Sequence, residues 1–204
     1  MSPTSIAAAD LRVVHPLGVS DRRKLLTLAR RAVCDRVEGD LPATTSVEDL
    51  PPRLREQGAS FVTLRKGDRL LGAVGSVSAD RALAVDVTDH ALAAAFADPR
   101  IPPITAADVG DMTVEVAVLG PLVPTGVGSF GELRELLRPQ IDGLVVGLGA
   151  RRYTFLPAVW REVRDVDDFL ALLWRKAGLS RGSWPADIKT WTYQVETVSD
   201  RPAG

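Results

Sequence analysis

Apolar positions at helical spacing predict three long helices in the chain. The first runs from Ser20, a residue type that caps helices, to Gly39, a typical C-terminal stop. The second covers 81–97 and is apolar around most of its circumference, so we expect it to be buried on more than one side and packed closely against a sheet. The third covers 166–177 and ends at Gly178. Shorter helical turns are expected at three further places: 53–57, 105–109 and 129–137.

Strand patterns separate these helices, and the first two form a hairpin. Residues 59–65 and 69–77 are rich in strand formers and flank a Lys-Gly-Asp turn at 66–68. Further strands are expected at four places: 112–119, 141–148, 153–155 and 191–198. Because hairpins are mixed with interposed helices, this order predicts an α+β fold with largely antiparallel pairing rather than a doubly wound parallel sheet.

Two glycines, Gly72 and Gly75, interrupt the second strand of the hairpin. A glycine inside a strand weakens it unless it allows a bulge or the close approach of another backbone or a ligand. From the sequence both explanations stay open: a bulge or tight packing under the following helix, and a ligand held against the strand.

Composition and charge narrow the class of protein. The chain has 204 residues, 46% hydrophobic and 25% charged, which is typical of a folded globular protein. Its net charge of -1 gives no overall attraction to nucleic acid or to anionic lipid, so neither is expected as a partner. Cys34 is the single cysteine, which excludes an internal disulfide and Cys-rich metal sites, and we expect no bound metal and a reducing compartment. No stretch resembles a signal peptide or reaches about 18 apolar residues, so we expect a cytoplasmic protein without a membrane partner.

The common catalytic motifs are absent from the sequence. There is no phosphate-binding loop, dinucleotide fingerprint, HExxH zinc motif or GxSxG nucleophile elbow, and no cofactor is expected. His90 lies on the polar arc of the second helix with Asp86 and Asp89, and we interpret it as solvent-facing or hydrogen-bonded rather than catalytic. The residues alone leave open whether the protein is an enzyme.

Five blocks of sequence, in order along the chain, carry a family resemblance. They are FVTLRKGDRLLGAVGS at 61–76, AAAFADPRIPPI at 93–104, VEVAVL at 114–119, LRPQIDGLVV with TFLPAVW within 137–160, and FLALLWRKAGL at 169–179. Together they resemble the AMMECR domain family, whose bacterial and archaeal members are named as the A component of the AmmeMemoRadiSam system. The similarity covers about 22–198. It divides the chain into an N-terminal extension (1–20), an AMMECR-like domain (21–198) and a C-terminal tail (199–204).

The resemblance implies more about fold than about function. It implies an α+β fold of two unequal lobes, with largely antiparallel sheets and packed helices, in which the glycine-bearing strand lines a cavity at the lobe junction. We therefore expect Gly72 and Gly75 to face a cleft between the lobes. The family's genomic association with a Memo-like protein and a radical S-adenosylmethionine enzyme implies these as partners in a shared pathway.

The family's hallmark in this strand, Leu-Arg-Gly-Cys-Ile-Gly, is altered here. Residues 70–75 read Leu-Leu-Gly-Ala-Val-Gly, so Leu71 replaces the arginine and Ala73 replaces the cysteine. Neither a thiol nucleophile nor a guanidinium clamp is available at these positions. Cys34, on the first helix, is interpreted as a packing residue. We therefore expect a protein that binds a small ligand or a protein partner without the family's cysteine chemistry.

Other positions match the family's pattern. Asp98 and Arg100 keep its Asp-x-Arg-x-Pro-Pro motif, and Glu115 and Lys176 also match, with a structural ion pair and a ligand role equally open for these last two. The resemblance and the strand together give nine candidate ligand-binding residues: Leu71, Gly72, Ala73, Gly75, Ser76, Asp98, Arg100, Glu115 and Lys176. The alternative is an enzyme that uses Glu115, Asp98 and Lys176 in one cleft as acid, base or anchor, although no catalytic residue is assigned.

Overall fold

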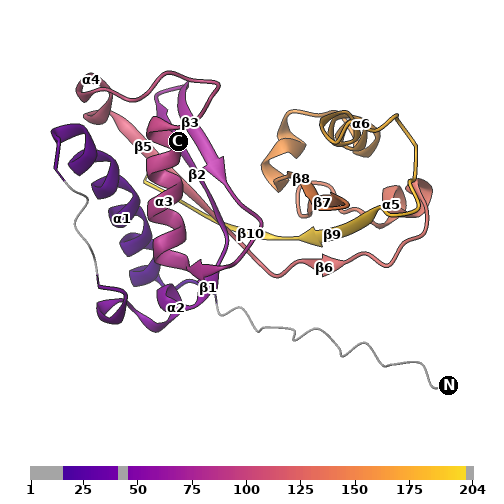
Figure 1. The fold of residues 1–204 in the computed structure, drawn as a ribbon, viewed down its shortest axis with the longest axis horizontal. Helices are drawn as coiled ribbons and strands as arrows, with labels where there is room; N and C mark the ends of the chain where they lie inside the picture. The colour runs from indigo at the N-terminus through magenta and orange to yellow at the C-terminus, as the bar shows by residue number, and fades with distance from the viewer. Residues whose placement is uncertain (1–15, 41–45, 201–204) are drawn as a thin grey trace.

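The computed structural model, which describes residues 16–40 and 46–200, has two lobes that lie side by side (Figure 1). Each lobe is built on a four-stranded sheet, and within the described residues every pairing between strands is antiparallel. The predicted α+β class with antiparallel sheets is confirmed. Most of the predicted N-terminal extension, residues 41–45 of a predicted loop and 201–204 of the predicted tail fall outside the described residues.

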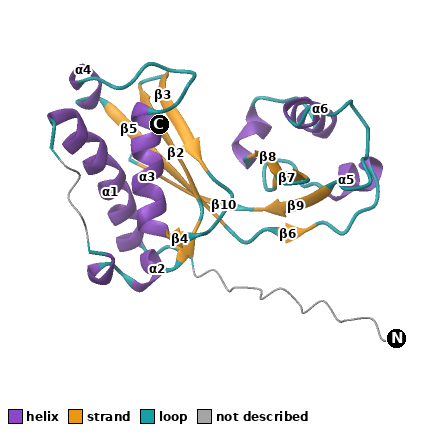
Figure 2. Cartoon of the chain, viewed as in Figure 1, coloured by secondary structure: helices purple, strands orange, loops and turns teal. Residues whose placement is uncertain are grey.

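The first lobe is a two-layer structure in which helices cover one face of the sheet (Figure 2). Its strand order is β10-β5-β2-β3, and α1 and α3 pack on the covered face and on each other. The bounds are α1 (Val19–Glu38), β2 (Ser60–Lys66), β3 (Arg69–Gly75), α3 (Leu83–Phe96), β5 (Met112–Leu119) and β10 (Val195–Ser199). Shorter elements complete this lobe: η1 (Val47–Asp49), α2 (Pro52–Arg55), β1 (Gln57–Gly58), β4 (Arg81–Ala82) and α4 (Ala106–Val109).

Alternation along β5 shows how the first lobe divides its residues between two faces. Val114, Val116 and Val118 are buried in the core under the helices. Glu115 and Ala117 point to the opposite face, because neighbouring side chains of a strand alternate. That opposite face of the sheet is turned toward the second lobe, as residues of both lobes line its pockets.

The second lobe has strand order β6-β9-β7-β8, with α5 and α6 packed beside the sheet. Its elements are β6 (Val123–Pro124), α5 (Phe130–Leu136), β7 (Gly143–Leu148), β8 (Arg151–Phe155), η2 (Pro157–Arg161), α6 (Val166–Lys176) and β9 (Lys189–Tyr193). Aromatic contacts hold its core, since Trp160 stacks on Phe169 with ring centroids 3.9 Å apart and Phe130 meets Trp174 edge to face at 5.1 Å. Burial of these rings fixes η2 against α6.

The predicted single strand 191–198 is wrong, because it is two strands in different sheets. β9 ends at Tyr193 and pairs with β7 in the second lobe, and β10 begins at Val195 and pairs with β5 in the first lobe. Gln194 lies between them and its carbonyl accepts the N–H of Gly120 at 2.8 Å. An alternating pattern indicates extended backbone but carries no information about which sheet supplies the partner strand.

Smaller differences concern the ends of the helices. α1 begins at Val19 with Gly18 as its N-cap, two residues before the predicted cap Ser20. Its predicted stop at Gly39 is confirmed by the left-handed φ of 87° there. The second predicted helix begins at Leu83 because Arg81 and Ala82 pair as β4 with β1.

No helix in residues 16–40 and 46–200 has both the length and the apolar character needed to cross a membrane.

Candidate functional site

The glycine-bearing strand β3 is an edge strand with a bulge at Leu71. The register pairs Arg65 with Leu70 and Leu64 with Gly72, which leaves Leu71 as the extra residue. Leu71 is 3% exposed and belongs to the core of the first lobe. The position that carries arginine in the resembling family's motif is therefore occupied here by a core side chain that lines no described pocket.

Gly72 and Gly75 face opposite sides of the sheet, which corrects the expectation that both face a cleft. A Cβ on Gly72 would overlap the carbonyl oxygen of Ala94 in α3, so close packing of the helix requires this glycine. Gly75 lies on the other face, where a Cβ would overlap the ring of Phe61, and it lines a pocket. The two glycines are three residues apart, and positions separated by an odd number in a strand point to different faces.

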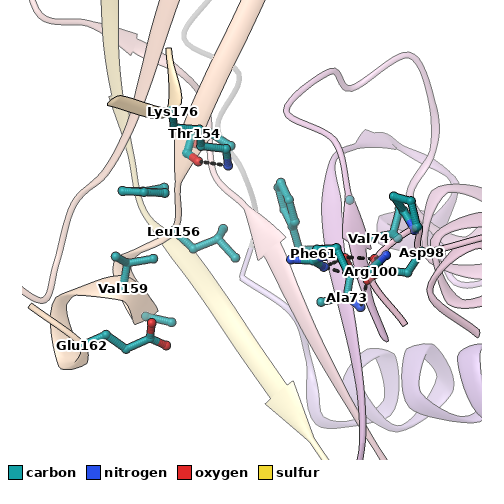
Figure 3. Close-up of a pocket in the computed structure, with 14 residues that line it drawn as sticks. Phe61, Ala73, Val74, Asp98, Arg100, Thr154, Leu156, Val159, Glu162 and Lys176 are labelled. Atoms are coloured by element: carbon teal, nitrogen blue, oxygen red, sulfur yellow. Dashed lines mark hydrogen bonds and ion pairs between the residues drawn. The ribbon is translucent and has the colours of Figure 1, made fainter. Parts of the chain in front are cut away.

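The largest described pocket on this face, about 560 Å³, lies between the two lobes (Figure 3). From the first lobe come Phe61, Ala73, Val74, Gly75, Asp98, Pro99 and Arg100, and from the second come Thr154, Phe155, Leu156, Ala158, Val159, Glu162 and Lys176. Figure 3 shows the labelled residues of the two lobes on opposite sides of the space. Five of the nine candidate residues thus meet here: Ala73, Gly75, Asp98, Arg100 and Lys176. Their ligand-binding role stays a prediction.

Asp98 and Arg100 hold the edge of the sheet at Ala73. The N–H of Ala73 donates to Oδ2 of Asp98 at 3.0 Å, and Nη2 of Arg100 donates to the carbonyl of Ala73 at 2.8 Å. Arg100 also donates from Nε and Nη2 to the two carboxylate oxygens of Asp98, at 2.9 and 2.7 Å. The two side chains therefore bond the outward N–H and C=O groups of Ala73, as a neighbouring strand would.

The charge state of Asp98 is fixed by these contacts. The hydrogen bonds from Arg100, with that from the backbone of Ala73, hold the pKa of this carboxyl far below its usual value although the side chain is buried. Asp98 is therefore ionised at neutral pH and has no proton to give to a ligand.

Lys176, at the end of α6, brings a second cation to the pocket. Its Nζ donates to the carbonyl of Thr154 at 3.0 Å and lies 5.1 Å from the centre of the Phe155 ring. No carboxylate of the described residues pairs with it. Burial, with the nearby charge of Arg100, lowers the pKa of Lys176 from its usual value. An anion in the pocket would relieve this repulsion.

Glu115 does not join the other candidates. It lines a second pocket of about 470 Å³ with Gln140 and Arg161, on the same face of the first sheet. Leu156 and Ala158 line both pockets and so lie between them. Glu115 forms no ion pair with any residue in the described ranges, and the structure therefore does not bring it together with Asp98 and Lys176.

Ser76 lies just beyond β3 and outside the described pockets. Its N–H donates to the carbonyl of Ser60 at 3.1 Å, and its hydroxyl accepts the N–H of Ser78 at 3.0 Å. These bonds end the hairpin, and Ser76 has a structural role here.

His90 is buried and hydrogen-bonded rather than solvent-facing. Its Nδ1 lies 3.1 Å from Oδ2 of Asp86 and 3.4 Å from Oγ of Ser60, and Oγ of Ser60 lies 2.7 Å from the same Asp86 oxygen. Although burial opposes ionisation, hydrogen bonds from His90 and Ser60 hold the pKa of Asp86 below its usual value. Both partners address the same ring nitrogen, so the imidazole cannot pass a proton from Ser60 to Asp86 as in a hydrolase triad.

Cys34, on α1, lines none of the described pockets. It is half-buried, and burial raises the pKa of its thiol, which disfavours the reactive thiolate. No three His, Cys, Asp or Glu side chains among the described residues gather closely enough to hold a metal ion.

Apart from Lys176, the residues of the second-lobe wall were not among the candidates predicted from the sequence. Leu156, Val159 and Glu162 come from η2 and its flanks, and no periodicity or charge pattern in the sequence marks them as pocket residues. The one available signal was the resemblance block TFLPAVW, which ends two residues before Glu162.

Comparisons with known proteins agree with the fold and the blocks. The family model described as AMMECR1 matches residues 26–198. A protein of Methanothermobacter thermautotrophicus is 35% identical over 165 residues, covering 80% of this chain and 85% of the relative. A protein of Thermofilum pendens is 33% identical over 201 residues, covering 92% and 94%. The crystal structure of the uncharacterized protein PH0010 from Pyrococcus horikoshii superposes with a TM-score of 0.75 at 30% identity, covering 85% of this chain and 88% of that one.

Proposed function

Because this chain belongs to the AMMECR1 family, we propose that it holds a small anionic ligand in the pocket between its lobes, without thiol chemistry. The observation that carries the proposal is the pair of cations, Arg100 and Lys176, that face one pocket from two lobes. A Memo-like protein or a radical S-adenosylmethionine enzyme is the partner that the family resemblance proposes for the same pathway.

The dimensions and lining of the pocket support a small organic ligand. Its volume of about 560 Å³ is within the range of roughly 300–1,000 Å³ found for small-molecule sites. Phe61, Leu156 and Val159 supply apolar walls, and Lys176 has two ammonium hydrogens beyond the one that Thr154 accepts. Such a lining favours a ligand with an apolar body and a negatively charged group.

Ala73 argues for binding without covalent catalysis. It stands where the family's motif has cysteine, and it lines the pocket with a methyl group that cannot act as a nucleophile. Cys34 offers no replacement because it lies on α1.

The acid–base alternative has less support. Glu115 lines the other pocket, and Asp98 is ionised and occupied by Arg100 and the backbone of Ala73. The three groups that this alternative requires are not arranged around one space.

Titration with simple carboxylates tests the proposal. The probes are benzoate and indole-3-acetate, with benzamide as the neutral control, and the readout is the NMR shift of Leu and Val methyl groups. We expect benzoate to shift the methyls of Leu156 and Val159, and not those of Val123, which lines a different pocket. Benzamide should bind more weakly.

A variant pair assigns the binding to the charge of Lys176. Lys176→Met should weaken benzoate binding about tenfold, whereas Lys189→Met, which removes an exposed lysine of β9, should leave it unchanged. If neither carboxylate shifts Leu156 or Val159, or if Lys176→Met binds benzoate as well as the wild type does, the proposed function is wrong.

A further inference from the structure

The register of the first sheet shows which backbone groups of β3 are left at its free edge. Residues of an antiparallel pair alternate between exchanging hydrogen bonds and turning their N–H and C=O groups away. The N–H of Ser76 donates to Ser60, so the next pair, Phe61 and Gly75, is of the second kind. Gly75 therefore turns its N–H and C=O away from β2, toward the open edge.

Ala73 confirms this reading of the edge. It is two residues before Gly75 and has the same orientation, and its outward N–H and C=O are the groups bonded to Asp98 and Arg100. Within residues 16–40 and 46–200, no side chain bonds the outward N–H and C=O groups of Gly75. The edge groups of Ala73 are therefore already bonded, whereas those of Gly75 are free to bind a ligand in the pocket.

An open donor and acceptor on a strand edge are complementary to one residue of extended peptide. Such a residue donates its own N–H to the strand's carbonyl and accepts the strand's N–H through its own carbonyl oxygen. If that residue is the last of its chain, the accepting oxygen belongs to a carboxylate, and its second oxygen is free to meet a cation.

From this arrangement we propose that the ligand is an N-acylated amino acid with a free carboxylate, held by the backbone of Gly75 and by Lys176. Its amide N–H donates to the carbonyl of Gly75, and its carboxylate accepts the N–H of Gly75 and an ammonium hydrogen of Lys176. The side chain of the amino acid is apolar, since Phe61, Leu156 and Val159 form the walls. The inference rests on the proposed function and names the ligand class of the same pocket.

The charges around the pocket favour a single carboxylate at the Lys176 end. Nη1 of Arg100 forms no hydrogen bond with the described residues, because Nε and Nη2 are the atoms engaged by Asp98 and Ala73. It offers a second donor from the first-lobe side of the same pocket (Figure 3). Glu162 lies at the other end of the second-lobe wall from Lys176 (Figure 3). A ligand with a second carboxylate at that end would be repelled.

Three compounds measure separately how much the amide N–H and the carboxylate of the ligand contribute to binding. N-acetyl-leucine carries both the amide N–H and the carboxylate, N-acetyl-leucinamide lacks the carboxylate, and N-acetyl-N-methyl-leucine lacks the N–H. Measured by calorimetry and by the methyl shifts of Leu156 and Val159, each of the two altered compounds should bind about tenfold more weakly than N-acetyl-leucine. Altering the ligand avoids substituting Gly75, where any side chain would displace Phe61.

A variant then tests whether Lys176 binds the carboxylate of the ligand. In Lys176→Met the preference for N-acetyl-leucine over its amide should fall from about tenfold to about equal, whereas Lys189→Met should keep it. Since the readout is a ratio of two ligands on one protein, a general loss of folding cannot imitate it.

Two sources supply this chemistry, a free N-acylamino acid and the carboxyl terminus of a peptide. An acetylated pentapeptide ending in leucine should bind at least tenfold more tightly than N-acetyl-leucine if the edge accepts further residues, and equally if only one residue is held. Equal binding of N-acetyl-leucine and its N-methyl derivative overturns the inference. If benzoate binds and N-acetyl-leucine does not, the inference fails while the proposed function stands, and if neither binds, both fail.

Discussion

The carboxylate of Asp98 accepts the backbone N–H of Ala73 at 3.0 Å, across the free edge of the first sheet. Arg100 completes this contact by donating to the carbonyl of the same residue. A side-chain pair thus occupies the place of a neighbouring strand, and it does so beside the pocket between the lobes.

Replacing Asp98 with Asn should destabilise the protein. The amide cannot accept both Arg100 donors and the backbone N–H with the strength of a carboxylate, and we expect a loss of about 2 kcal/mol in the free energy of unfolding. Urea denaturation measures it. The control is Asp167→Asn, which breaks an exposed pair with Arg134 and should change the value by less than about 0.5 kcal/mol. Equal effects of the two substitutions would contradict the role given to Asp98.

Stability should fall as the pH drops below the pKa of an unfolded aspartate. The folded pKa of Asp98 is lowered, so its contribution is complete above the ordinary value of 3.8 and is lost as the pH falls from there toward the folded pKa. We expect Asp98→Asn to lose less unfolding free energy than the wild type between pH 5 and about pH 3. Denaturant titrations at both pH values for both proteins check this, and parallel losses would count against it.

Gly72→Ala should lower the free energy of unfolding strongly, although it adds only a methyl group. The new methyl group would overlap the backbone carbonyl of Ala94, so α3 must move away from β3, at a cost of about 3 kcal/mol or more. Gly110→Ala is the matched control, because open space surrounds that position and its φ of -57° suits alanine. Thermal denaturation should show a large loss for the first variant and no loss for the second.

Ala73→Cys should place a reactive thiol in the pocket. Position 73 lines the pocket that Arg100 and Lys176 face, and these two cations outnumber the one carboxylate beside position 73, that of Asp98. Net positive charge lowers the pKa of a thiol, whereas burial raises that of Cys34. In a Cys34→Ser background, the new cysteine should react with iodoacetamide faster than Cys34 does in the wild type, as followed by intact mass. Bound benzoate should slow the reaction. A thiol at position 73 that resists alkylation until the protein unfolds would show that the pocket is closed.

The sequence predicted most elements because their signals are local. The apolar stripe that ends at Gly39 and the hairpin around 66–68 depend only on neighbouring residues, and both are present. The expectation that Gly72 and Gly75 share a face was wrong for a local reason, because their spacing of three already places them on opposite faces of a strand. The contact of Gly72 with Ala94 could not be predicted from the sequence, because it depends on how α3 packs on β3.

The candidate site was predicted in part. Asp98, Arg100 and Lys176 came from the family resemblance and meet in one pocket, but Glu115 came from the same resemblance and lies in the other. Spacing in the sequence could not separate them, since the position of Lys176 depends on how the second lobe packs against the first. Glu162 was missed for the same reason.

The Gly120–Gln194 hydrogen bond joins the two chain segments that connect the first lobe to the second. β5 and β10 are neighbours in the first sheet, with Leu119 opposite Val195, so the whole second lobe occupies the place of a hairpin loop. The first lobe already has its four strands and two main helices from residues on either side of that loop. The second lobe is thus a domain inserted into a β-hairpin of the first lobe. The pocket lies at the interface between the inserted domain and the domain that contains the insertion.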